Sequence, residues 1–393
     1  MLKTLKFKLY NNDNYQKRFD KEVSICRKVY NTAKETYEYA AASGVYLSEF
    51  DLNNQLPSCK KEFPYLKKVH SGCLQAVIST FRKAYDNYYK QLKNGTIIKL
   101  KAKYLNKCSQ NNQPVNYKHL REIGRPKWAK KKEFNSIQFK TFQIKKGKIK
   151  LPGWGFIKVF NEKYLNKYEI SRTRNAILKK EVDGLYLSIV IDIVPIQKDN
   201  NNQVVGIDMG IKYFCVTSDG EFIDNPRFLE KQLKTLRGAQ RKLSRKYKKG
   251  VKIQSKNYYK QVDVVARLHK KVKDARKDFL HKKSTYLANN YGIVIHEDLN
   301  IAGMAKSNLS RHIYDISWGT FFLMLAYKTQ VIKVNPAYTS QKCSNCGHTC
   351  KENRLTQSIF KCVSCNFEQN ADKNACYNIK KAGASAINAN LSH

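Results

Sequence analysis

The stretch Val204-Val-Gly-Ile-Asp-Met-Gly-Ile-Lys-Tyr-Phe decides the fold of the second half of the sequence. Its first four residues predict a short buried strand, and Asp208 is the one acid in the stretch. A buried lone carboxylate costs free energy unless it is paired or holds a metal ion, although an ordinary aspartate at a strand end also fits. The two glycines of the stretch allow another segment to approach the backbone closely. Asp219-Gly220 predicts a turn, which would place Asp208 on the first strand of a β-hairpin.

The net charge indicates a polyanionic partner. The 393 residues include 74 Lys and Arg against 31 Asp and Glu, a net charge of +43. Such an excess destabilises a compact chain by self-repulsion unless a polyanion balances it, and nucleic acids are the most common polyanions. An anionic membrane is the rival partner. We see no apolar run of transmembrane length and no signal peptide, and therefore expect a cytoplasmic protein of a prokaryotic cell, associated with the nucleoid when bound to DNA.

The eleven cysteines predict one metal site in a reducing compartment. Cys343 and Cys346 form one C-x2-C pair, and Cys362 and Cys365 form a second, 15 residues later. This is zinc-ribbon spacing, in which four thiolates fill a closed tetrahedral shell around one structural Zn²⁺ ion. His348 and Cys350 lie close by in sequence and are competing ligands. Without a metal ion, this segment would have almost no core.

The remaining sequence predicts an α+β protein of several domains. Alternating residues 2–10 predict a half-buried strand, and residues 15–124 have a helical period. Short strands return from residue 134 and end in a hairpin around Asp183-Gly184, which suggests a small barrel that includes the first strand. The helical segment would be an insertion into this barrel. Residues 198–202 form a polar linker, and residues 384–393 a frayed tail.

Residues 227–283 are the most basic helical region, with 21 Lys and Arg against four Asp and Glu. Their apolar residues recur at helical spacing, which predicts a long antiparallel helix pair. A solvated helix face normally mixes both charges, so this imbalance favours contact with phosphates.

Three acids could form a catalytic site. Asp208 lies on one predicted strand, Glu297 ends a second, and Asp372 begins the last helix. Together they could hold two Mg²⁺ ions, which prefer carboxylate oxygens and support phosphodiester hydrolysis. Asp298 would point away from Glu297 in a continuing strand. Each acid alone could be a surface residue, and Asp372 also fits a helix cap.

Five segments carry a resemblance to a known family: GIDMGIKYF, NPRFLEKQLKTLRGAQRKLSRK, HEDLNIAGM, VNPAYTSQKCSNCG and NADKNACYNIK. In this order they resemble TnpB, the RuvC-type nuclease of insertion sequences, which is related to type V CRISPR effectors. The resemblance runs from about residue 203 to residue 382, with looser similarity before it. It implies that Asp208, Glu297 and Asp372 are the catalytic acids that bind two Mg²⁺ ions, and that Cys343, Cys346, Cys362 and Cys365 bind one Zn²⁺ ion.

The resemblance also implies a domain order. We expect a wedge β-barrel (1–10 and 134–197) with a helical recognition insertion (11–133), an RNase-H-like RuvC domain (203–342 and 368–383) with an inserted zinc ribbon (343–367), and a tail (384–393). The implied activity is Mg²⁺-dependent endonuclease cleavage of double-stranded DNA beside a short transposon-adjacent motif. The implied partner is one guide RNA from the element's own end, bound to a monomer.

Two alternatives remain open. The chain could be a miniature type V CRISPR effector with a repeat-derived guide, or an RNA-guided DNA-binding protein with impaired cleavage. The second alternative draws on one departure from the family pattern. Family members usually have several more residues, often with a glycine turn, between the helix at 318–327 and the strand at 331, where this chain has only Lys328-Thr-Gln.

Overall fold

The computed structural model describes residues 2–10, 13–131, 133–194, 203–251, 253–304, 306 and 310–391. The chain divides into two compact units, Met1–Ile196 and Gln197–His393. The predicted linker at 198–202 lies outside the described residues. Among the described helices, none has the length and apolar character needed to cross a membrane.

The first unit contains two antiparallel sheets. One has the strand order β1-β7-β6-β2, with strands β1 (Leu2–Lys8), β2 (Ser136–Phe139), β6 (Ile170–Glu181) and β7 (Gly184–Ile193). The other has the order β3-β4-β5, with strands β3 (Gln143–Lys145), β4 (Lys148–Leu151) and β5 (Gly155–Ile157). Strand β1 pairs with β7, and an isolated bridge joins Leu9, just after β1, to Val159, just after β5. The first strand therefore joins the later strands, as predicted.

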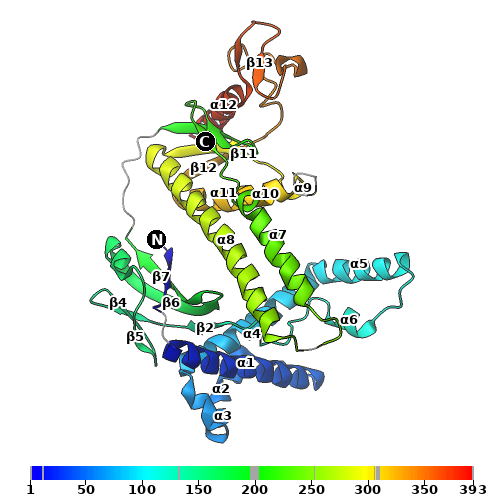
Figure 1. Cartoon of the computed structure of the whole chain (residues 1–393), viewed down its shortest axis with the longest axis vertical. Coiled ribbons are helices and arrows are strands. Elements are labelled where there is room, and N and C mark those ends of the chain that lie inside the picture. The colour runs from blue at the N-terminus through cyan, green and yellow to red at the C-terminus, as the bar shows by residue number, and fades with distance from the viewer. Residues whose placement is uncertain are drawn as a thin grey trace. The chain divides into compact units, whose positions relative to one another are not determined.

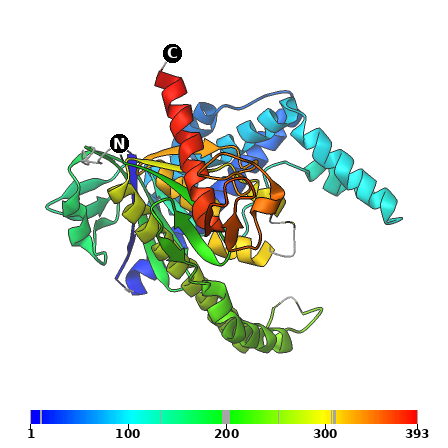
Figure 2. The same cartoon turned by 90° about the horizontal axis from the view of Figure 1, so that it is seen from above.

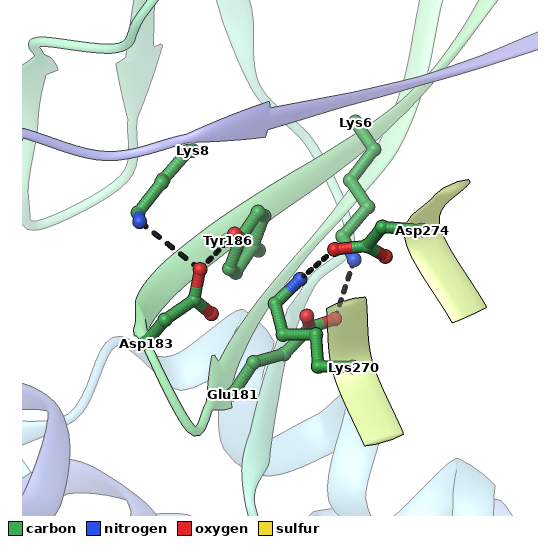
Figure 3. A network of polar contacts seen from close by, with 7 residues as sticks. All are labelled: Lys6, Lys8, Glu181, Asp183, Tyr186, Lys270 and Asp274. Atoms are coloured by element: carbon green, nitrogen blue, oxygen red, sulfur yellow. Dashed lines mark hydrogen bonds and ion pairs between the residues drawn. The ribbon is translucent and has the colours of Figure 1, made fainter. Parts of the chain in front are cut away.

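Ion pairs close the predicted Asp183-Gly184 turn onto the first strand (Figure 3). Lys8 Nζ lies 3.0 Å from Asp183 Oδ2, and the Tyr186 hydroxyl donates to the same oxygen at 2.8 Å. Lys6 forms an ion pair with Glu181, the last residue of β6. Because these side chains are partly exposed, each pair contributes little stability, at most about 1 kcal/mol.

Helices follow β1 in the first unit (Figure 1). They are α1 (Asp13–Ala42), α2 (Glu49–Asn54), α3 (Leu56–Glu62), α4 (Ser71–Lys93), α5 (Thr96–Gln110) and α6 (Tyr117–Glu122), with the 3-10 turn η1 (Pro64–Lys68). Along α4, side chains at helical spacing are buried in the core: Cys73, Val77, Phe81, Tyr85 and Tyr88.

The second unit is built on a five-stranded mixed sheet of order β10-β9-β8-β11-β12. The strands are β8 (Val204–Met209), β9 (Tyr213–Thr217), β10 (Phe222–Asp224), β11 (Ile293–Glu297) and β12 (Gln330–Val334). Strand β11 runs parallel to both β8 and β12, whereas β8, β9 and β10 form an antiparallel meander. Asp208 is on the first strand of a hairpin as predicted. The Asp219-Gly220 turn, however, joins β9 to β10, because the β8–β9 connection is made at residues 210–212.

The helices of the second unit are α7 (Phe228–Lys246), α8 (Lys256–Asn290), α9 (Ile301–Met304), α10 (Ser310–Ile316), α11 (Trp318–Ala326) and α12 (Ala371–Leu391). The predicted pair α7 and α8 lies side by side (Figures 1 and 2). Before α12 come the 3-10 turn η3 (Lys351–Asn353) and the hairpin β13 (Ile359–Lys361) and β14 (Glu368–Asn370).

Helix α12 crosses the sheet at unusually short range. A Cβ atom on Gly206 would lie 2.4 Å from the carbonyl oxygen of Cys376 and 2.7 Å from the amide nitrogen of Lys380. A Cβ atom on Gly383 would lie 2.3 Å from Ile295 Cδ1. Gly383 therefore packs against the sheet and does not end the helix, which continues to Leu391. The helix therefore extends through residues 384–391, where the sequence suggested a frayed tail.

This crossing predicts the effect of a single methyl group. Gly206→Ala should destabilise the second unit by at least about 1 kcal/mol, because the strand or the helix backbone must move. Gly238→Ala is the matched control, because this glycine lies inside α7 with no heavy atom within 4 Å of its Cβ position. It should stabilise the protein by about 0.4–1 kcal/mol. Hydrogen-exchange mass spectrometry in a urea series measures both effects, and equal tolerance of the two substitutions would contradict the close crossing.

Candidate active site

Two of the predicted acids lie at the carboxyl ends of neighbouring parallel strands. The last paired residues of β8 and β11 are Ile207 and His296, and Asp208 and Glu297 directly follow them. Residues at matching positions of adjacent parallel strands point to the same face, and the strands are about 4.8 Å apart. Asp208 and Glu297 therefore share one edge of the sheet. Asp298 points away, as predicted, and pairs at the surface with Lys333, with 3.0 Å between Nζ and Oδ1.

Helix α12 brings the third acid to the same edge. Helix α12 crosses β8 at Gly206, where Cys376 and Lys380 approach the strand. The start of the helix lies toward the carboxyl end of β8, because Asp372 lines the same cleft as Asp208. Asp372 lies one turn before Cys376. Asn370 caps the helix, because its Oδ1 accepts hydrogen bonds from the amides of Asp372 at 3.0 Å and Lys373 at 3.2 Å. The carboxylate of Asp372 is therefore not used as the cap.

The pKa of Asp208 shows that the acids interact. It is raised to about 7, first by burial and then by the negative charges of Glu297 and Asp372. Burial also raises the pKa values of Glu297 and Asp372. A group of carboxylates that resists ionisation is a suitable site for a divalent cation, whose charge would offset the repulsion. Their role as metal ligands stays a prediction.

Two further residues contact the acids, and our sequence analysis did not name them. Arg354 Nη2 lies 3.8 Å from Asp372 Oδ1, and its charge lowers the pKa of both Asp372 and Asp208. The Thr339 hydroxyl donates a hydrogen bond to Glu297 Oε1, which lowers the pKa of that acid. An arginine in a strongly basic chain and a threonine in a loop have no local pattern that would reveal them.

Buried asparagines of α12 hold the loop that carries Thr339. Asn378 Nδ2 donates to the carbonyl oxygens of Thr339 at 2.9 Å and Lys342 at 2.6 Å. Asn374 Nδ2 donates to the Lys342 carbonyl at 2.8 Å, and its Oδ1 accepts from the Ser344 amide at 2.9 Å. Because α12 also carries Asp372, one helix fixes this acid directly and Glu297 through the loop.

A cleft of about 230 Å³ opens beside the acids. Asp208 and Asp372 line it together with Lys212, Asn370 and residues Gln357 and Ser358 of the segment between the cysteine pairs. Glu297 is not among its lining residues. Acidic groups beside lysine and amide groups suit a phosphate ester held next to a cation.

The four predicted cysteines meet at one point. Their Sγ atoms all lie within 4.8 Å of one another, with 3.7 Å between Cys343 and Cys365 and 3.6 Å between Cys346 and Cys362. Four sulfurs at the usual Zn–S length of ~2.3 Å stand about 3.8 Å apart, so the geometry fits a tetrahedral ion. The alternative ligand Cys350 contacts Glu352 instead. Within the described ranges, this is the one cluster of three or more potential ligands gathered so closely.

The two cysteine pairs have the same backbone geometry. In the first pair, the Cys343 amide donates to the His348 carbonyl at 2.8 Å, and in the second, the Cys362 amide donates to the Phe367 carbonyl at 2.9 Å. Gly347 and Asn366, which directly follow each pair, have φ angles of +81° and +58°. Gly and Asn tolerate this left-handed conformation best, so these residues are part of the cysteine motif.

The helix pair α7 and α8 presents a basic surface. Every Lys and Arg from Lys231 to Lys246 in α7 is exposed. In α8, Asp274 pairs with Lys270 at 2.6 Å and Asp278 with Lys282 at 2.7 Å. These two acids are therefore neutralised within α8, while the basic residues of α7 face solvent. This surface suits a phosphate backbone.

In the short junction between α11 and β12, the side chains of Lys328 and Thr329 form hydrogen bonds. Lys328 Nζ donates to Ser284 Oγ at 2.6 Å and Thr285 Oγ1 at 2.9 Å on α8. Thr329 Oγ1 donates to the carbonyl oxygens of Tyr291 at 3.0 Å and Gly292 at 2.7 Å. The chain thus turns from α11 into β12 in three residues without leaving these polar groups unpaired.

Known proteins resemble this chain over most of its length. The family model OrfB_IS605, described as "Probable transposase", matches residues 186–308, and a model for the TNB domain of Cas12f1-like proteins matches residues 318–379. A protein of Escherichia coli (strain K12), designated a putative RNA-guided DNA endonuclease, InsQ, is 29% identical over 412 aligned residues, which cover 98% of this chain and 93% of that protein. A TnpB-like protein of Methanocaldococcus jannaschii is 37% identical over 126 residues, which cover 31% of this chain and 30% of that protein.

A solved structure of the mini-RNA-guided endonuclease CRISPR-Cas_phi3 aligns with 98% of this chain and 92% of its own, at 13% identity and a TM-score of 0.48. That score is too low to establish a shared overall arrangement. The matches to a transposase family model and to TnpB-like proteins agree with the resemblance that the motifs predicted.

The pKa of Asp208 predicts a pH-dependent effect on stability. Its pKa is about 7 in the folded protein against 3.8 for an ordinary aspartate, so the folded state binds more protons between these values. Stability therefore falls as the pH rises toward 7, and the full cost is present above 7. Asp208→Asn should raise the thermal unfolding midpoint at pH 8 in EDTA and change little near pH 4. Asp224→Asn, an exposed position on β10, is the control, and equal midpoints for Asp208→Asn and wild type at pH 8 would contradict the raised pKa.

Proposed function

We propose that the protein is an RNA-guided endonuclease of a transposable element that cuts double-stranded DNA beside a short flanking motif. The observation that supports this most directly is the convergence of Asp208, Glu297 and Asp372 at one sheet edge, with the pKa of Asp208 raised by the other two. The basic surface of α7 and α8 supports nucleic-acid partners, and the InsQ relative supports the reaction. The mixed sheet crossed by α12 supports an RNase-H-like RuvC fold for the second unit.

The proposed mechanism assigns a task to each residue at the site. Two bound Mg²⁺ ions would supply an activated water and stabilise the leaving oxygen of the phosphodiester. Asp208, the most strongly buried of the three acids, would be one of the residues that hold the ions, and it would be ionised when it does so. Thr339 would keep Glu297 oriented through its hydrogen bond. Arg354, beside Asp372, would donate hydrogen bonds to the phosphate as negative charge develops there.

We propose the same domain roles for the rest of the chain. Residues 1–10 and 134–197 would form the wedge domain, and residues 11–133 the recognition insertion that faces the duplex. Residues 203–342 and 368–383 would form the nuclease domain, and one monomer would carry one guide RNA. The two sheets and the intervening helices of the first unit support this division.

Cleavage of a matched plasmid tests the proposal. Purified protein with its co-purified RNA and Mg²⁺ should cut a plasmid that carries the guide-matched sequence and the flanking motif. Asp208→Ala should lower the cleavage rate at least about 1000-fold, because the metal site is lost. Asp224→Ala is the matched control and should cut like wild type. A plasmid left intact by wild type, or cut equally by Asp208→Ala, would contradict the proposal.

Two further measurements, a transcription assay and sequencing of the co-purified RNA, separate the two alternatives. Target binding that blocks transcription without nicking the DNA would identify a nuclease-impaired binding protein. The side chains of Lys328 and Thr329 are hydrogen-bonded in the short junction, so the structure gives no support for this alternative. A repeat-derived sequence in the co-purified RNA would identify a CRISPR effector, whereas an element-end sequence would support the TnpB role.

We also propose that the four cysteines hold one structural Zn²⁺ ion. Purified protein should contain about one zinc ion per chain, as measured by inductively coupled plasma mass spectrometry. Cys362→Ser should lose nearly all of it, because a buried ligand of the shell is removed. Cys350→Ser, outside the cluster, should keep it. Equal zinc content in the two variants would show that the ion lies elsewhere.

A further inference from the structure

The first unit contains a second, larger cleft of about 1070 Å³ that the proposed cleavage chemistry does not use. It is lined by the end of the first strand, by β4 and β5, and by the 3-10 turn η2 (Glu162–Lys167). Its floor includes the buried side chains of Ile157 and Val159. The feature that needs an explanation is its aromatic lining.

Aromatic rings stand half-exposed in and beside this cleft. Tyr10 is 49% exposed, Phe156 is 50% and Tyr164 is 42%, and Phe160, which stacks on Tyr10, is 42%. The Tyr10 and Phe160 rings are 3.9 Å apart at an interplanar angle of 28°. These rings add little to the core, because much of their surface faces water. A gathering of exposed rings is typical of a binding site.

The backbone holds these rings in fixed positions. The Phe160 amide donates to the Lys8 carbonyl at 2.8 Å, and the Tyr10 amide donates to the Lys158 carbonyl at 3.3 Å. Phe156 lies in β5, where it pairs with Lys150 of β4. Rings on paired strands lose little conformational entropy when a ligand stacks on them.

The charges around the rings select an anionic ligand. Lys148, Lys158, Lys163 and Lys167 line the cleft, and Lys167 Nζ lies 5.1 Å from the centre of the Tyr164 ring. The one acid among the lining residues is Glu162. Its half-buried side chain lines the cleft, and an ionised carboxylate can accept a hydrogen bond from a donor on the ligand.

A single nucleic-acid strand meets all three requirements. Its bases stack on exposed rings, its phosphates pair with lysines, and its ribose 2′-hydroxyl or base amino groups can donate to a carboxylate. A base-paired duplex does not fit, because its bases are already stacked and shielded. An acidic peptide has no groups that would use the row of rings.

We propose that this cleft binds unpaired nucleotides of the guide RNA by stacking on Tyr10, Phe156 and Tyr164. RNA is favoured over a displaced DNA strand because Glu162 can accept a hydrogen bond from the 2′-hydroxyl that only RNA carries. The inference rests on the proposed RNA-guided function. It adds a binding site on the first unit, separate from the carboxylates of the second.

Binding of a single-stranded RNA that carries 2-aminopurine tests the site. Its fluorescence should be quenched by wild type, and Phe156→Ala should lose the quenching and weaken binding about 5- to 150-fold, the loss of one stacked base. Phe156→Trp should restore both. Tyr39→Ala, at a ring that is 80% exposed on α1, is the matched control and should bind like wild type.

Salt dependence separates stacking from charge. Phe156→Ala should leave the slope of log affinity against log salt unchanged, whereas Lys163→Gln should reduce it by about 0.7 if this lysine contacts a phosphate. Glu162→Ala should reduce the preference for RNA over single-stranded DNA of the same sequence.

Three results would overturn the inference: unchanged RNA affinity in Phe156→Ala, an equal loss for duplex RNA, or tighter binding of single-stranded DNA than of RNA by wild type. Thermal unfolding of each variant checks that it is folded, and Phe156→Leu, which keeps most of the volume but no ring, should behave like Phe156→Ala. If Phe156→Ala binds RNA like wild type and wild type cuts the matched plasmid, the RNA-binding role of the cleft is rejected and the nuclease proposal stands. A wild-type protein that binds no RNA would reject both.

Discussion

The close crossing of α12 over β8 is the contact on which the candidate site depends. Gly206 allows the carbonyl of Cys376 to approach the strand where no side chain would fit, and Gly383 does the same against β11. A helix held this close has little freedom to slide. Its first turn is therefore fixed relative to the strand ends, and Asp372 is fixed with it. Backbone geometry, more than any side-chain bond, brings an acid 164 residues away in sequence to Asp208.

The assembled acids impose an electrostatic cost on the cation-free protein. Three carboxylates at one edge repel one another, and burial makes their hydration poor, so the pKa of Asp208 rises to about 7. The positive charges of Arg354 and Lys212 relieve part of this cost at Asp372. A site that is destabilised while empty is typical of a functional centre, because the binding of a cation recovers the lost free energy.

The sequence predicted the features that depend on local patterns. The cysteine pairs at 343–346 and 362–365 have a spacing that fixes their geometry within a few residues, and Gly206 indicated a close approach before its partner was visible. Arg354 and Thr339 could not be predicted, because their role arises only when the loop and the ribbon fold back onto the strands. The Asp219-Gly220 turn was assigned to the wrong pair of strands, since a turn signal does not specify which neighbours it joins. The packing of Gly383 against Ile295 could not be predicted either, because it depends on how α12 lies on the sheet.

The position of the ribbon in the chain couples it to the acids. It is inserted between β12 and α12, and Asn374 and Asn378 of α12 bond to the loop that enters it. The same loop carries Thr339, which holds Glu297, and the ribbon carries Arg354, which lies near Asp372. A ribbon that loses its order would therefore release both contacts at once. Because both asparagines are buried, this coupling has a high cost if either partner is lost. The cysteine cluster is in this way part of the structure that holds the acids in place.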